Sequence, residues 1–286
     1  MEVVVGIGHS GCAIADSLKK EEGYEVYKID SKIRGNRTLS LSEKKTIQQH
    51  EAAALEITDK VQGLFEDIAK DDSVTVVLSG ADSASGSALV VLESLRSKTD
   101  NLDVLYIRPD RGFLSEEKKS NDAFVGGVLQ EFARSGLIEK IYLVDIARAE
   151  AIMGEVPIAE YEDRLHKLIA STASLIKFYN SASPLMDNRG EMKDTSRIAT
   201  FGVSSFENNI PEEMFFNLSN PTEKIYYYGM SKGDLESDGT LLRKIKSHAK
   251  SMEKKEAGYS ISFAVFETSY EENMVLCCVF SDKVQV

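Results

Sequence analysis

Short apolar runs alternate with helical stretches through the first half of the chain, and this alternation constrains the fold more than any other feature. The runs are rich in β-branched residues and lie at Val3–Ile7, Tyr24–Ile29, Val74–Leu78, Val104–Ile107 and Ile141–Val144. Strands that are apolar on both faces are typical of parallel sheets covered by helices. The intervening stretches indicate helices at Cys12–Lys20, Leu41–Lys70, Gly86–Lys98 and Glu116–Ser135. The pattern therefore predicts right-handed βαβ units in an α/β, Rossmann-like domain with a parallel sheet.

The second half of the chain has a different character. A long helix with a broad apolar face is predicted over Ile158–Tyr179, and it ends before Pro184. Further elements follow, with strands and one helix at Lys224–Tyr228, Tyr259–Phe266, Met274–Phe280 and Thr240–Lys254. The last two strands are joined by a short polar loop, so we expect them to pair antiparallel. The predicted organisation is a Rossmann-like domain over 1–156, an interdomain helix over 157–182 and a smaller α+β domain over 183–286.

Composition excludes several classes of protein. The chain has 286 residues, of which 42% are hydrophobic and 28% charged, as in globular rather than disordered proteins. Its formal charge is −12 and it has no Lys/Arg block, which argues against direct nucleic-acid binding. No apolar run reaches the roughly 18 residues that a membrane helix needs, so we expect no membrane association.

The cysteines and histidines do not indicate a metal site or a disulfide framework. Cys12, Cys277 and Cys278 have neither the number nor the spacing for one, and the histidines lie far apart in sequence. A strand at Val3 stands where a secreted protein would carry its signal peptide. These features favour a reducing, cytoplasmic location.

Glycines follow the first predicted strand. Gly6, Gly8 and Gly11 permit a tight turn, and a phosphate could approach the backbone there at the start of the next helix. Asp30 ends the second predicted strand about twenty residues on, where dinucleotide enzymes place an acid that binds ribose. The pair supports an NAD-dependent enzyme, and it is equally compatible with a turn that binds no ligand.

A second loop of this kind, from Ser79 to Gly86, lies between the strand predicted at Val74–Leu78 and the next helix. Its backbone amides could form another anion cradle. Two such cradles in one sheet are not what a dehydrogenase needs.

At this point the chain resembles the tubulin/FtsZ family. Gly8 and Gly11 match that family's first Gly-x-x-Gly turn. The family's phosphate-loop signature, Gly-Gly-Gly-Thr-Gly-Thr/Ser-Gly, is matched in register at Gly80, Ser83, Ser85 and Gly86, whereas Ala81, Asp82 and Ala84 replace other positions.

The order of later segments is also similar to that family. The Ile107–Pro109 segment resembles its Thr-Lys-Pro, and the acidic–basic helix start at Glu116 resembles its Glu-Gly-Arg/Lys segment. Asp145 follows a strand where the family has Pro-Asn-Asp. The segment Pro184–Asp187 resembles the Gly-Leu-Met-Asn that opens the family's catalytic loop.

The resemblance implies a protein that binds GTP or GDP between subunits, assembles with itself head to tail and has GTPase activity. It assigns nucleotide binding to Gly8, Gly11, Gly80, Ser83, Ser85, Gly86 and Glu116. It assigns catalysis on a neighbour's nucleotide to Glu191 and Asp194, two acids three residues apart. An open alternative is that these two acids only favour the positive end of a following helix dipole.

Several positions depart from the family pattern. Asp82 puts a carboxylate where phosphate charge is expected, and two like charges about 4 Å apart repel by roughly 4 kcal/mol at an effective dielectric of about 20. A Mg²⁺ ion could bridge them. Counting back along the long helix puts His166 and Lys167 at the base-reading positions, with Tyr161 beside the aromatic one, so the base specificity stays open.

Three hypotheses for function follow. The chain stops at Val286, shortly after its last predicted strand, so we expect a compact, divergent member that resembles plasmid- or phage-borne relatives more than division-ring FtsZ. The first hypothesis is GTP-dependent head-to-tail assembly with slow hydrolysis. The second is a structural assembly protein of the same fold without effective nucleotide binding, and the third is the NAD-dependent enzyme.

Overall fold

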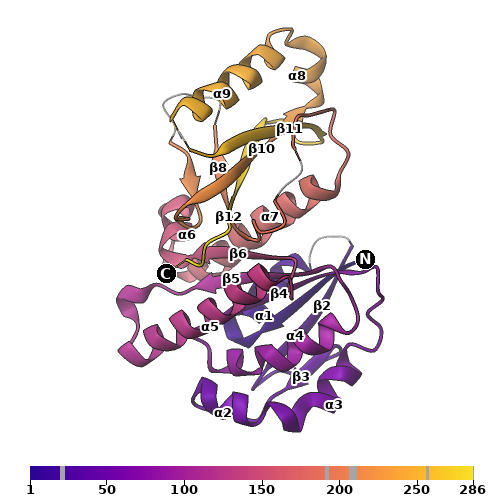
Figure 1. Cartoon of the computed structure of the whole chain (residues 1–286), viewed down its shortest axis with the longest axis vertical. Helices are drawn as coiled ribbons and strands as arrows, with labels where there is room; N and C mark the ends of the chain where they lie inside the picture. The colour runs from indigo at the N-terminus through magenta and orange to yellow at the C-terminus, as the bar shows by residue number, and fades with distance from the viewer. Residues whose placement is uncertain (20–22, 191–192, 206–210, 256–257, 286) are drawn as a thin grey trace. The chain divides into compact units, whose positions relative to one another are not determined.

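The structure is a computed structural model of the chain, and it describes residues 1–19, 23–190, 193–205, 211–255 and 258–285 (Figure 1). The chain divides into two compact units, Met1–Ser171 with Val284–Val286, and Thr172–Lys283. The division falls within the helix α7 (Tyr161–Ser181). The domain limits expected from the sequence, at 156/157 and 182/183, stay a prediction.

The first unit is built on a parallel sheet. Its strand order is β3-β2-β1-β4-β5-β6, and every pair of neighbours in it is parallel. The strands are β1 (Glu2–Ile7), β2 (Tyr24–Asp30), β3 (Thr38–Ser40), β4 (Ser73–Ser79), β5 (Leu102–Arg108) and β6 (Lys140–Asp145). The predicted Rossmann-like sheet is therefore present in this unit.

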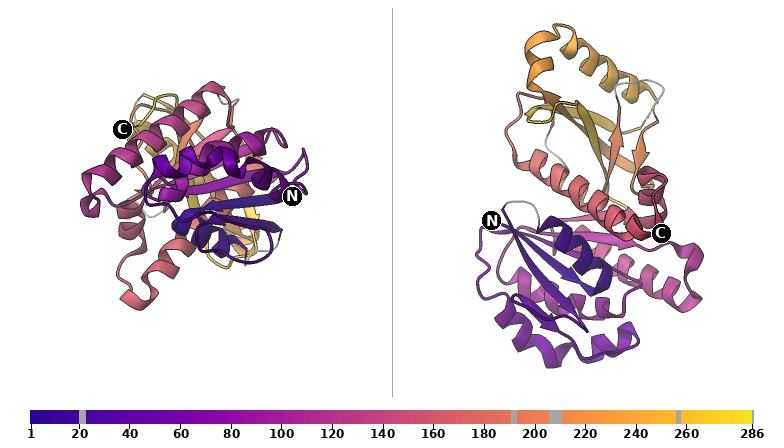
Figure 2. Two further views of the ribbon diagram at one scale, coloured as in Figure 1. Left: turned by 90° about the horizontal axis from the view of Figure 1, so that it is seen from below. Right: turned by 180° about the vertical axis from the view of Figure 1, so that it is seen from behind.

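Helices cover both faces of this sheet. They are α1 (Gly8–Leu18), α2 (Ile47–Ala52), α3 (Ala54–Leu64), α4 (Ala88–Arg96), α5 (Glu116–Ser135) and α6 (Ile146–Met153), with short 3₁₀ turns η1 (Ser83–Ser87), η2 (Arg111–Phe113) and η3 (Ile158–Glu160). Helix α1 packs against β1, β2 and β4, and the view from behind in Figure 2 shows it over that face. Helices α4 and α5 lie on the other side in Figure 1, where α3 packs on α4. Burial on both faces explains the uniformly apolar β1, in which Val3, Val4 and Val5 are buried.

The second unit has a mixed sheet. Its order is β8-β12-β10-β11-β7, and β9 pairs antiparallel with β8. The strands are β7 (Met186–Asp187), β8 (Ile198–Ser204), β9 (Glu213–Met214), β10 (Pro221–Ser231), β11 (Ser260–Thr268) and β12 (Met274–Ser281), and the helices beside α7 are α8 (Lys232–Ser237) and α9 (Leu241–Lys255).

The central strand β10 explains the aromatic run of this unit. Tyr226 and Tyr228 join Leu241 and Ile245 of α9 in one buried cluster. Tyr227 points the other way and stacks on Tyr179 of α7, with ring centroids 5.8 Å apart. Alternate residues of a strand face opposite sides, so β10 supplies apolar surface to α9 on one face and α7 on the other.

Some sequence expectations are wrong. The stretch Leu41–Lys70 is not one helix, because the chain turns at Ala53 (φ −88°, ψ −2°) between α2 and α3. Strands β11 and β12 do not pair with each other, because β10 lies between them, parallel to β11 and antiparallel to β12. The pattern also missed α6 and β8. Within the described residues, no helix is long and apolar enough to cross a membrane.

Candidate functional site

The strand order of the first unit reverses direction between β1 and β4. In open α/β sheets, ligands bind beyond the carboxyl ends of the strands at this point. The loop that opens α1 at Gly8 follows β1, and the loop from Gly80 to Ser87 follows β4. The two loops expected from the sequence to bind phosphate therefore flank the same crevice.

Asp82 bridges these two loops. Its Oδ1 accepts a hydrogen bond from the Ala84 amide at 3.0 Å, which caps η1, and its Oδ2 accepts one from the His9 amide of α1 at 2.7 Å. Gly8 has a positive φ of +73°, and a Cβ there would collide with the Asp82 carboxylate. The backbone conformation and the close approach both require glycine at this position.

The other glycines of the expected site serve close packing. A Cβ at Gly11 would collide with the Val77 carbonyl of β4, and one at Gly86 would collide with the Ile47 carbonyl of α2. Gly80 lies against Tyr106 and the backbone of α5. A bulky residue at Gly86, which from the sequence alone would be expected to weaken nucleotide binding without unfolding the chain, would thus displace α2 as well.

The serines of the second loop differ in their partners. The Ser83 hydroxyl donates to the Lys44 carbonyl at 3.2 Å, which ties η1 to the segment before α2. Ser85 is buried, and its hydroxyl has no hydrogen-bond partner in the part of the chain that the structure describes.

Glu116 is the first residue of α5 and lies in solvent. Its carboxylate pairs with Lys119 on the same helix at 2.8 Å, and that hydrogen bond lowers the pKa of Glu116. Glu116, which was expected to bind nucleotide, is therefore held in an ion pair within its own helix. Gly8 and Ser83 belong instead to the two loops that Asp82 joins.

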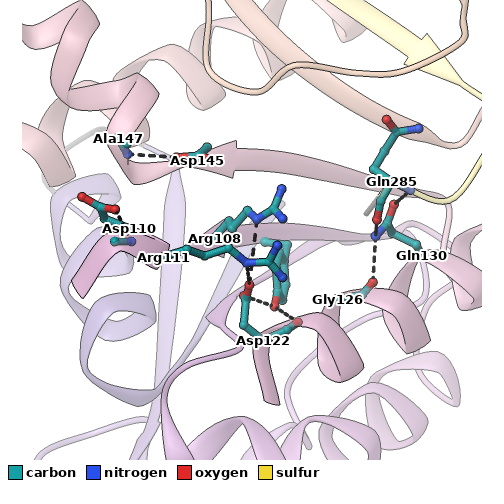
Figure 3. Close-up of polar contacts among 11 residues, drawn as sticks. Arg108, Asp110, Arg111, Asp122, Gly126, Gln130, Asp145, Ala147 and Gln285 are labelled. Atoms are coloured by element: carbon teal, nitrogen blue, oxygen red, sulfur yellow. Dashed lines mark hydrogen bonds and ion pairs between the residues drawn. The ribbon is translucent and has the colours of Figure 1, made fainter. Parts of the chain in front are cut away.

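A buried polar cluster borders the second loop (Figure 3). Asp122 of α5 is 2% exposed, accepts a hydrogen bond from the Tyr106 hydroxyl at 2.7 Å and lies 3.3 Å from the Arg111 guanidinium, with Arg108 at 3.9 Å. Burial raises the pKa of Asp122, while the hydrogen bond from Tyr106 and the two arginines oppose that shift. This cluster was not predicted from the sequence. The sequence holds one signal for it. An acid at position 122 lies three and seven residues before the apolar Val125 and Leu129, on the same face of the helix.

The residues expected to read a base lie on the first half of α7. Burial lowers the pKa of His166, Glu162 opposes that shift, and repulsion from His9 of α1 adds to it. The Tyr161 hydroxyl instead donates to Glu150 of α6. Lys167 lines a groove of about 710 Å³ between α6 and α7, together with Glu160 and Asp163.

The expected catalytic acids belong to the second unit. Glu191 lies outside the described residues. Asp194 is exposed on a turn, where its backbone carbonyl accepts a hydrogen bond from Arg197 at 2.7 Å. Nearby, Asp187 forms an ion pair with Arg189 at 2.7 Å.

These observations test the fit of a nucleotide. The His9 and Ala84 amides are the donors that a phosphate at this crevice would use, and both are taken by Asp82. With Asp82 so placed, the residues present do not fit a phosphate in this cradle. Among the described residues, no group of three or more His, Cys, Asp or Glu side chains could hold a metal ion.

Comparison with known proteins identifies the fold. The GTPγS-bound protofilament of CetZ2 from Haloferax volcanii superimposes with a TM-score of 0.73 at 14% identity, over 98% of this chain and 92% of that one. The GTPγS-form protofilament of TubZ from Bacillus thuringiensis serovar israelensis gives 0.71 at 13%, over 99% and 87%. The FtsZ dimer of M. jannaschii gives 0.68 at 12%, over 98% and 88%. The chain matches no protein-family model and no curated protein sequence.

At these identities the matches show the fold and nothing finer. The chain has the tubulin/FtsZ fold over nearly its whole length, and the α/β architecture expected from the sequence is confirmed.

Proposed function

We propose that this chain, which has the tubulin/FtsZ fold, is an assembly protein that polymerises with copies of itself head to tail. The observation that carries this proposal is the match of 98% of the chain to the CetZ2 protofilament. A head-to-tail contact joins different surfaces of the two copies, and it gives a filament when the rotation does not close a ring.

GTP or GDP is the ligand that this function would place at the crevice between β1 and β4. The retained Gly8 turn, the amide of His9 and the strand order all support a phosphate site there. Asp82 opposes it, because its carboxylate holds the same amides. We therefore propose that the unaltered chain binds guanine nucleotide only weakly, because a phosphate can reach these amides only when the Asp82 carboxylate moves aside.

A second candidate function is assembly without any nucleotide, and the Asp82 bridge specifically favours it. The carboxylate already ties the two loops together, which is what a phosphate would do. The NAD-dependent enzyme has less support, since Asp30 accepts a hydrogen bond from its neighbour Ser31 at 2.7 Å and the fold matches extend through the second unit.

We propose that any hydrolysis by Glu191 and Asp194 depends on assembly, because these acids would act on the nucleotide of a neighbouring copy. The exposed position of Asp194 suits a residue that acts on another copy. Turnover, if the chain has any, is then expected to be slow and to rise per molecule with protein concentration.

Sedimentation of the purified chain over a concentration series, with and without GTP and Mg²⁺, tests the proposal. We expect polymer above a threshold concentration and monomer below it. Equal pelleting with and without GTP supports the nucleotide-free candidate, whereas a strict need for GTP supports the nucleotide-dependent one. A chain that stays monomeric under all conditions contradicts both.

A further inference from the structure

Aspartates lie at or shortly after the ends of three neighbouring strands of the first sheet. Asp82 and Asp110 come after β4 and β5, and Asp145 is the last residue of β6. Each caps the next helical turn by accepting a hydrogen bond from the amide two residues on, at 3.0, 2.8 and 2.9 Å. The caps of Asp110 and Asp145 are visible in Figure 3. Among the contacts of the described residues, Asp82 alone of these caps also accepts from a separate element, through the His9 amide of α1.

The donors that Asp82 takes lie on both sides of the crevice. The His9 amide belongs to the first turn of α1, and the Ala84 amide belongs to η1 after β4. Free amides at helix starts attract anions, because they carry unsatisfied donors and the positive end of the helix dipole. The Asp82 carboxylate accepts a hydrogen bond from each of these amides. It therefore takes the place that a bound anion would have between the two loops.

The shape of the loop is adapted to this carboxylate. Gly8 adopts a left-handed φ of +73°, and its missing Cβ leaves the space in which the Asp82 carboxylate lies. A phosphate group at the same amides would have to occupy that space and would meet a negative charge at close range. Exclusion by volume and repulsion by charge therefore act in the same direction.

We infer that Asp82 is a built-in substitute for a nucleotide phosphate. Its carboxylate joins the loops after β1 and β4, and a phosphate of GTP binds at these amides only by displacing it. The inference rests on the proposed function for the location of the nucleotide. It adds that Asp82 sets the affinity for GTP and that this residue opposes the phosphate part of the nucleotide.

The test is calorimetric titration of GTP and of guanosine, each with Mg²⁺ present, into the full chain and its variants. Removing the carboxylate in Asp82→Ala is expected to tighten GTP binding about 10- to 100-fold, the effect of freeing two amides and removing a like charge. Guanosine carries no phosphate, so its affinity should not change. Asp82→Asn, which keeps the shape and removes the charge, should show a smaller gain for GTP.

Asp110→Ala is the matched control. It removes a cap of the same geometry after the neighbouring strand, without a bond to α1. Its GTP affinity should equal that of the unaltered chain. If Asp82→Ala does not fold, as judged by circular dichroism, the comparison rests on Asp82→Asn.

The inference is overturned if the folded Asp82 variants bind GTP no more tightly than the unaltered chain, including the case in which none binds GTP. An equal gain for guanosine would also contradict it. Sedimentation of the same variants separates this result from the proposed function. If the Asp82 variants bind GTP more tightly but no polymer forms, the role of Asp82 is supported and the assembly proposal is contradicted. If polymer forms but the affinity for GTP does not rise, assembly is supported and the role of Asp82 is contradicted.

Discussion

Single residues of the crevice could be found in the sequence, but their roles could not. Gly8, Gly11, Gly80 and Gly86 were expected to approach a phosphate, and the structure shows instead what a side chain at each would strike: a carboxylate, two carbonyls and a tyrosine. Those partners come from β4 and the loop after it, from α2 and from β5, all distant along the chain from the glycines that they meet. The charge of Asp82 could be noted from the sequence, whereas its bond to His9, 73 residues earlier, could not.

The buried carboxylate of Asp122 is expected to stabilise the fold, so replacing it should lower the free energy of unfolding. Asp122→Ala removes the side-chain acceptor of the Tyr106 hydroxyl, which keeps the backbone carbonyl of residue 122 at 2.8 Å, and leaves the Arg111 guanidinium, 36% exposed, without its buried carboxylate. Breaking a buried pair from one side typically costs about 3–5 kcal/mol, and we expect a loss in the lower part of that range because Arg111 can reach solvent. Urea denaturation followed by circular dichroism measures it.

Asp110→Ala serves as the control for that measurement. Asp110 caps η2 at the surface, and losing an exposed cap of this kind costs about 0.5–2 kcal/mol. Equal losses for the two variants would show that burial of Asp122 adds nothing to its contribution.

At the level of elements, helix α5 and all strands of the first sheet except the short β3 could be predicted closely, because their periodicity is local. The predicted helix over Glu116–Ser135 has the bounds of α5. The break at Ala53 could not be predicted, since α2 packs on η1 and α3 packs on α4, and these contacts outweigh helix propensity. Gly202, which lies against β9, interrupted the apolar pattern of β8 and hid that strand.

The misassigned pairing of β11 with β12 has a similar cause. The loop between them crosses the end of β10, where the Asn273 side chain accepts a hydrogen bond from the Ser231 amide at 2.8 Å and donates one to Asp234 at 2.6 Å. These bonds hold the loop across a strand that the hairpin pattern does not include.

The start of α9 gives a prediction about ionisation. Asp238 accepts hydrogen bonds from Lys244 at 2.7 Å and from Thr240, and these lower the pKa of Asp238 to about 2. A carboxyl whose folded pKa is depressed contributes stability above its ordinary pKa near 3.8, and that contribution is lost as pH falls through about 2. Lys244→Ala should raise the pKa of Asp238 towards the ordinary value.

Carboxyl-detected NMR titration of the unaltered chain and of Lys244→Ala measures this shift. Lys246→Ala is the matched control, because Lys246 is an exposed lysine on the same helix and Lys244 is the one paired with Asp238. A pKa of Asp238 that is the same in all three proteins would mean that Lys244 does not stabilise the carboxylate.

For the whole molecule, head-to-tail assembly requires that one copy cover surface at the carboxyl edge of the first sheet. Phe113, in the turn after β5, is 91% exposed at that edge. An aromatic side chain that becomes buried at the centre of an interface can contribute a large part of the binding energy, so Phe113 is the residue to substitute. Phe113→Glu should raise the threshold concentration for assembly about tenfold or more, in line with the loss of an aromatic anchor.

Leu55→Glu is the control for this surface. Leu55 is 84% exposed on α3, a helix that does not directly follow a strand, so its substitution introduces the same charge at a similarly exposed apolar position. Sedimentation should give the same threshold for Leu55→Glu as for the unaltered chain. If both variants raise the threshold alike, added charge rather than the loss of Phe113 is the cause.

Electron cryo-microscopy of the chain above its threshold concentration distinguishes head-to-tail assembly from every other association. We expect filaments in which each copy contacts the next through two different surfaces, with the crevice between β1 and β4 of one copy covered by the second unit of its neighbour. Monomers at every concentration, or closed two-fold dimers that join through the same surface on both copies, would contradict it.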